Sequence, residues 1–214
     1  MLTRLRLCAA FAALLAATTS VVAHPHVWVT VKSEVVFDKQ GKVAAIRHHW
    51  TFDEMYSAFV TTGIGVSGKP ATPEQLLPVA KVNVDSLAEF DYFTEAKDGH
   101  GKVEFAKPTE YSMTESDKLL ATLSFTLPLA TPTSAGKAFS FQVFDPTFFV
   151  DFTFDKNDPV TLVDAPKGCS VTNLKPPPLT PAEDQKLTLA AAEDFSPDAA
   201  FVIRLSDRPI IACP

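Results

Sequence analysis

The sequence is poor in cysteine, in glycine and in long apolar runs. It has 3 cysteines and 8 glycines among 214 residues, and its single extended apolar stretch is at the N-terminus. Without a second such stretch, the mature chain is not expected to insert stably into a membrane. Basic residues are also few, since 19 Lys and Arg stand against 25 Asp and Glu, for a formal net charge of −6. Nucleic acid is therefore not an expected partner, because phosphate binding needs a concentrated basic face.

The N-terminal stretch has the order of features of a secretory signal peptide. Two arginines precede an apolar run from Leu7 to Leu15, and a Val-Val-Ala sequence of small residues follows. The run is shorter than the roughly 20 residues that cross a hydrocarbon core. We therefore expect residues 1–23 to be removed, so that the mature protein is periplasmic, begins at His24 and carries a formal charge of −8 instead of −6.

Two cysteines remain after this cleavage, Cys169 and Cys213. In an oxidising compartment an isolated pair of this kind usually forms a disulfide. The bond would fasten the C-terminus to the body of the protein. The alternative is a pair of buried thiols.

The remaining pattern predicts a mainly β (α+β) fold. Residues alternate between apolar and polar from Val27 to Phe37, and a turn at 38–41 leads to a return strand from Lys42 to about Thr51. Further short strands are expected at 92–96, 102–106, 109–113, 119–127, 138–145, 148–154, 161–163 and 170–174, with a terminal strand ending at Cys213. We predict one domain, 24–214, built as an antiparallel β-sandwich.

Helices are expected at two places. Capping-box spacing at Thr51–Glu54 and at Thr72–Gln75 predicts a two-helix insertion at about 53–91, with Pro73 at the first position of the second helix. A C-terminal helix is expected to start at Thr180 and run to about Asp194.

Histidines gather at the predicted mature N-terminus and on the adjoining hairpin. Cleavage before His24 would free its α-amine and imidazole to bind one metal ion together. Pro25 has no N–H, which excludes the copper or nickel chelate that uses deprotonated backbone amides. His26, with His49 or His48 from the neighbouring strand, would complete a nitrogen-rich site for a divalent transition metal, that is nickel, cobalt, zinc or copper.

The expected register of the hairpin adds a carboxylate to this set. If the turn centres on residues 39–40, residue numbers that sum to about 79 face each other. This places His49 opposite Thr30 and Asp53 near His26, as a ligand or as a hydrogen-bond partner of one. The alternative is that these histidines are ordinary surface or hydrogen-bonded residues. Neighbours in a strand point to opposite faces, so His48 and His49 must have different roles.

A second candidate set lies in the segment 144–152, where Asp145 and Asp151 stand among aromatic residues. A carboxylate in apolar surroundings is costly unless it is paired, hydrogen-bonded or bound to a cation. Both are therefore candidate metal ligands. The alternative for Asp145 is that it caps the turn at Pro146 and Thr147. As an acid/base pair the two have no partner residues, so the pattern does not indicate an enzyme.

Several motifs occur together in one order: His24-Pro25-His26-Val27-Trp28, then the runs 49–55, 89–94 and 144–152, and finally Gly168-Cys169. In these motifs, and over most of its mature length, the chain resembles the domain of unknown function 1007 family. The resemblance implies a periplasmic component of a transport system, of a kind often associated with nickel/cobalt-type permeases.

Many members of that family carry a calcium loop of EF-hand type between two helices. Residues 63–74 have the length of such a loop, with Gly68 at its sixth position and Glu74 at its twelfth. Four positions that should supply oxygen-rich ligands are instead occupied by Gly63, Gly65, Ser67 and Ala71. We therefore expect no calcium binding by this loop.

Together these observations predict a non-enzymatic periplasmic protein that binds a transition-metal ion. It would deliver the ion to, or buffer it for, an inner-membrane metal permease or another transport component. The ligands must lose protons to bind, so the affinity should depend on pH. The alternative is a structural or interaction module of a periplasmic transport system. A copper oxidoreductase is the least favoured reading, because the sequence shows no flat aromatic binding face.

Overall fold

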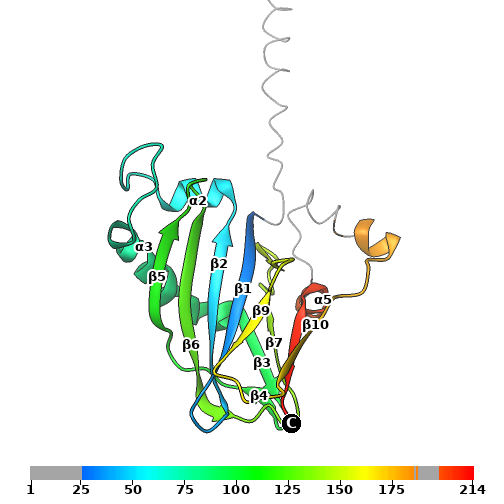
Figure 1. The fold of residues 1–214 in the computed structure, drawn as a ribbon. Helices are drawn as coiled ribbons and strands as arrows, with labels where there is room; N and C mark the ends of the chain where they lie inside the picture. The colour runs from blue at the N-terminus through cyan, green and yellow to red at the C-terminus, as the bar shows by residue number, and fades with distance from the viewer. Residues whose placement is uncertain (1–25, 186, 188–197) are drawn as a thin grey trace, which may run out of the picture.

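The computed structural model describes residues 26–185, 187 and 198–214, and its framework is two β-sheets (Figure 1). The larger sheet has the order β5 (Thr109–Glu115), β6 (Ala121–Thr133), β2 (Val43–Phe52), β1 (Val27–Phe37) and β8 (Val150–Phe154), with β9 (Val160–Val163) also paired to β1. The smaller sheet has the order β10 (Ser170–Leu174), β11 (Arg208–Ala212), β7 (Phe139–Val143), β3 (Thr94–Asp98) and β4 (Gly101–Val103). The predicted mainly β (α+β) fold is confirmed.

The hairpin of β1 and β2 follows the predicted alternation, with every second residue of β1 buried. Its register differs from the prediction by two residues, because His49 pairs with Lys32 and not with Thr30. One cause is the turn, where Asp38 N–H bonds to Lys42 O and Gly41 has φ +71°. The other is a bulge at the end of β1. Each irregularity shifts the pairing by one residue, and the total shift of two residues leaves the side chains beyond the bulge on their predicted faces.

The larger sheet is mixed, whereas a purely antiparallel arrangement was predicted. Both β8 and β9 run parallel to β1, β8 beside its first half and β9 beside its second. The chain reaches them from β7 in the other sheet, and such a crossover lets a strand join in the parallel direction. The other strand pairs are antiparallel.

The helical insertion is present. Helix α2 (Glu54–Val60) has Asp53 as its N-cap, because Thr51 still belongs to β2 and the Asp53 side chain accepts the Tyr56 N–H. Helix α3 (Pro73–Ser86) starts with the predicted capping box of Thr72 and Gln75 and packs against β5. The last part of the predicted two-helix insertion at 53–91 is instead a 3₁₀ segment, η1 (Leu87–Phe93), with left-handed residues near its end.

The C-terminal part is fastened as expected. Cys169 and Cys213 form a disulfide with their Cα atoms 4.1 Å apart, which confirms that pairing. Residues 181–185 and 187 are helical, and the rest of the predicted C-terminal helix lies outside the described residues. A further short helix, α5 (Ala199–Leu205), precedes β11 and was not predicted. In the described ranges, no helix has the length and apolar character needed to span a bilayer.

Candidate functional site

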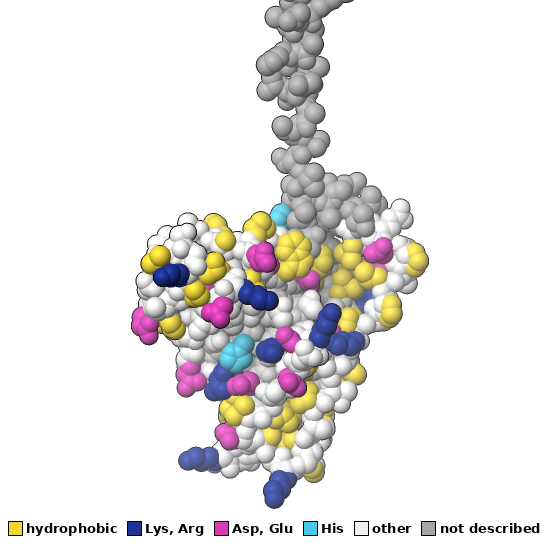
Figure 2. Space-filling model, turned by 45° about the horizontal axis from the view of Figure 1, so that its top comes forward, with side chains coloured by type: hydrophobic (Ala, Val, Ile, Leu, Met, Phe, Trp, Pro, Cys, Tyr) yellow, Lys and Arg dark blue, Asp and Glu magenta, His cyan; other side chains and the backbone are white. Residues whose placement is uncertain are grey.

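His26 stands at the end of the larger sheet where β1 begins. Its N–H donates to the Phe149 carbonyl oxygen at 2.8 Å, and the His26 and Phe149 rings are 4.7 Å apart. Trp28, two residues on, is 46% exposed on the outer face of the sheet. His24 lies outside the described residues. Figure 2 shows hydrophobic side chains near this end and charges of both signs on the face below.

Two of the predicted carboxylates flank Trp28. The Asp53 carboxylate accepts the N–H groups of Trp28 and Tyr56, both at 2.9 Å, so it holds the start of α2 against β1. Asp151 pairs with Trp28 from the other side, in β8. Burial raises the pKa of Asp151 above its usual range, and a hydrogen bond from Thr153 opposes this rise. Asp53 and Asp151 therefore lie at the same end of the sheet as His26.

His49 lies much further along the same face. It pairs with Lys32, six residues beyond His26 in β1, which corresponds to about 20 Å at the rise of a strand. Its Nδ1 is 2.8 Å from the Ser124 hydroxyl. Burial lowers the pKa of His49, an effect that Glu34 partly offsets. His49 is thus separated from His26, and it lies two residues further along β1 than the predicted register had placed it.

His48 points the other way, into the space between the sheets, as the strand alternation predicts. It is fully buried, with Nδ1 3.0 Å from the Ser33 hydroxyl and Nε2 3.3 Å from that of Thr94. The Thr94 hydroxyl donates to Tyr92 O, so it accepts from Nε2–H, and Nδ1 accepts from Ser33. Burial, and secondarily His49, lower the pKa of His48 to about 3. Both ring nitrogens are occupied, which leaves none for a metal ion.

Asp145 caps a turn. Its Oδ1 accepts the N–H and hydroxyl of Thr147, at 2.8 and 2.7 Å, and its Oδ2 accepts the N–H groups of Phe149 and Val150, at 3.1 and 3.0 Å. The side chain is only 4% exposed. Four hydrogen bonds fill the acceptor positions of a carboxylate. This geometry matches the turn-capping alternative for Asp145.

Within the part of the chain that the structure describes, no three His, Cys, Asp or Glu side chains form a group able to hold a metal ion. Of the predicted ligands, the structure brings His26, Asp53 and Asp151 to one end of the sheet. It places His48 and His49 elsewhere, and Asp145 in a turn.

An aromatic pocket that was not predicted from the sequence lies beside this end of the sheet. Its volume is about 350 Å³. Seven aromatic residues line it: Trp50, Phe52, Tyr56, Phe90, Phe93, Phe149 and Phe152. The indole N–H of Trp50 is buried and finds no acceptor among the described residues. The clustering of Phe in the runs 89–94 and 144–152 was the available signal, but their contact depends on the pairing of the two sheets.

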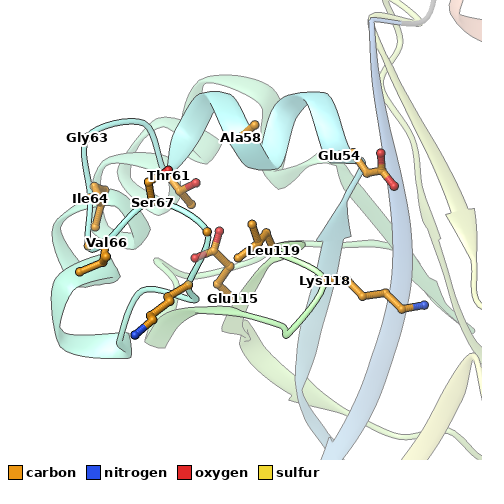
Figure 3. A pocket seen from close by; sticks show the side chains of 13 residues that line it. Glu54, Ala58, Thr61, Gly63, Ile64, Val66, Ser67, Glu115, Lys118 and Leu119 are labelled. Carbon is orange, nitrogen blue, oxygen red and sulfur yellow. The ribbon is translucent and has the colours of Figure 1, made fainter.

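A second hollow, of about 610 Å³, lies between the loop that joins α2 to α3 and the turn that joins β5 to β6 (Figure 3). Glu115 points into it from β5 and accepts the Ala71 N–H at 2.7 Å. Glu54 and Lys118 lie on its far side (Figure 3). Glu115 thereby braces the loop at 63–74, whose predicted lack of calcium binding stays a prediction.

A family model described as a protein of unknown function (DUF1007) matches residues 9–207, so the chain belongs to this family. An uncharacterized protein of Haemophilus influenzae is 26% identical over 158 residues, which cover 73% of this chain and 75% of that protein. An uncharacterized 15.5 kDa protein in the trpE 3′ region of Spirochaeta aurantia is 30% identical over 114 residues, which cover 52% of this chain and 81% of that protein. The resemblance drawn from the sequence motifs is confirmed at the level of the family.

Proposed function

We propose that the protein is a non-enzymatic periplasmic accessory protein that binds a divalent transition metal at its N-terminus. It would deliver the ion to, or buffer it for, an inner-membrane permease. The observation that carries the proposal is the anchoring of His26, whose backbone and ring are both held by Phe149 at the end of the sheet. After cleavage before His24, the α-amine and the imidazole of His24 would lie two residues before His26 in the chain.

The ligand set is narrower than the one expected from the sequence. It consists of the amine and ring of His24 and the ring of His26, three nitrogen donors that suit nickel, cobalt, zinc or copper. Asp151 is the sheet carboxylate that could assist, because it pairs with Trp28 at this end of the sheet, whereas both oxygens of Asp53 already accept backbone N–H groups. Burial disfavours the charged form of Asp151, and a bound cation would favour it. Since these groups must lose protons to bind, the affinity should rise with pH.

Calorimetric titration of the mature protein with Ni²⁺, Co²⁺, Zn²⁺ and Cu²⁺ tests the proposal. We expect near-stoichiometric binding of at least one ion, weakened ten-fold or more by His26→Ala and abolished by one extra alanine before His24. His49→Ala is the matched control, since it alters a histidine on the same face about 20 Å away. Equal losses in His26→Ala and His49→Ala, or no binding at micromolar metal, would contradict the proposal.

A second candidate, an interaction module of a periplasmic transport system, is supported by exposed apolar side chains on α2. Met55 and Phe59 are 66% and 74% exposed, and such side chains grouped on one surface are typical of partner contacts. Cross-linking to the permease would then survive alanine replacement of His24, His26 and His49. It would be lost on replacing Met55 and Phe59 by serine.

A further inference from the structure

The aromatic pocket is formed where the helical insertion meets the strand ends, and it differs from an ordinary gap in the core. Its walls come from β1, β2, β6, β8, α2, α3, η1 and the turn at 145–149. Phe90 and Phe149 are 51% and 47% exposed at its edge. The volume of about 350 Å³ is at the lower end of the range for small-molecule sites, which are largely apolar and lined by aromatic rings.

The residues that line this pocket, within the part of the chain that the structure describes, carry no positive charge. Among the described lining residues none is Lys, Arg or His, and the single charged side chain is Asp145. An adjoining hollow shares Phe90, Phe93 and Asp145 with the pocket and adds three carboxylates and one cation: Glu89, Asp91, Glu95 and Lys102. Aromatic ring faces also carry negative electrostatic potential. An anion is therefore disfavoured here, and a cation is attracted by both the rings and the carboxylates.

The backbone that sets the pocket walls is strained. Asp91, Tyr92 and Phe93 are consecutive non-glycine residues with φ of 49°, 55° and 46°, and Phe148, next to Phe149, has φ 58°. A left-handed conformation costs an L-residue free energy that the surrounding structure must supply, and such strain is concentrated at functional sites. Here the left-handed residues lie in or beside the segments that bring Phe90, Phe93 and Phe149 to the same pocket.

We propose that this pocket binds a small organic cation with an apolar body, such as a quaternary ammonium compound. The methyl groups around the nitrogen would contact the ring faces, and no direct ion pair is needed because the charge of Asp145 and its acidic neighbours acts through the apolar medium. The proposal is independent of metal binding at His24 and His26.

A matched set of three ligands separates charge from shape. Choline, its neutral carbon analogue 3,3-dimethyl-1-butanol and the anion 3,3-dimethylbutanoate share a trimethyl head group. The chain has 2 tryptophans, so Trp28→Phe leaves Trp50 in the pocket wall as the only tryptophan reporter. With EDTA present to remove metal, we expect saturable changes in Trp50 fluorescence and in binding heat. Choline should bind about 2- to 30-fold more tightly than the alcohol, and the anion should not bind measurably.

Two phenylalanine variants locate the site. Phe149→Leu removes a ring face but keeps an apolar side chain, and it should weaken choline binding five-fold or more while changing alcohol binding less than two-fold. Phe59→Leu is the control, because Phe59 is exposed and does not line the pocket. Equal losses in the two variants would overturn the assignment. So would an alcohol that binds as tightly as choline, or the absence of a saturable response to choline by both methods.

Discussion

Aromatic residues occupy two neighbouring regions of this protein, and they are buried in one and partly exposed in the other. Between the sheets, Phe125, Phe139 and Phe141 are buried, and Trp50 meets Phe125 edge to face at 4.9 Å. In the pocket, Phe90 and Phe149 are half exposed around open space. The two regions share Trp50, so residue type does not separate them. Rings are fully covered where two sheets face each other, and they are left open where one of the covers is a strained 3₁₀ segment.

The largest expected effect is in the inter-sheet core. Phe125→Ala should lower the free energy of unfolding by about 3–5 kcal/mol, because it removes a fully buried ring and leaves a cavity. Urea denaturation followed by circular dichroism measures the loss. A change below about 1 kcal/mol would mean that the core around Phe125 is not tightly packed, and the contrast with the pocket would fail.

The turn that carries Phe149 depends on a single carboxylate. Asp145→Ala should cost about 2–4 kcal/mol, since three backbone N–H groups and one hydroxyl lose a charged acceptor. The same variant should abolish ligand binding in the pocket, because Phe149 is no longer held. Urea denaturation and hydrogen exchange at residues 147–150 measure the two effects. Unchanged exchange in this turn would show that Asp145 does not organise it.

Acid should destabilise the core through His48. Its pKa is about 3 in the folded protein against 6.5 without burial, so the unfolded chain takes up this proton first as the pH falls. Stability from this group is fully present above pH 6.5 and declines toward pH 3, by about 1.4 kcal/mol per unit, or about 2 kcal/mol at pH 5. His48→Gln should flatten the dependence measured in urea between pH 7 and 5. His49→Gln should leave most of this pH dependence unchanged. The same slope in both variants would show that His48 is not its source.

The smallest effect is expected at the pocket edge. Phe90→Ala should change the free energy of unfolding by less than about 1 kcal/mol, because its ring is already half exposed. Thermal unfolding measured alongside Phe125→Ala checks the difference. A loss as large as that of Phe125→Ala would show that the pocket is part of the core.

Much of the fold could be predicted locally. The faces of β1 and β2, the capping box of α3, the bounds of β10 and the disulfide all follow from spacing or composition. Predictions that needed a distance between segments were less accurate. The hairpin register was wrong by two residues, which moved His49 about 7 Å further from His26 than predicted, to about 20 Å. The N-cap of α2 was misassigned because Thr51 and Asp53 both suit that position, and only the extent of β2 chooses between them.

By itself, the sequence determined which side of β1 and β2 is apolar and where α3 starts, because these depend on residues close together in the chain. It also identified the family, through short motifs spread along the chain. Only the tertiary structure decided that His48 is a buried, doubly hydrogen-bonded core residue and that β8 and β9 join β1 in parallel. It also decided that two Phe-rich segments more than fifty residues apart enclose one pocket. These outcomes depend on how the two sheets stack, and no local pattern of residues specifies that arrangement.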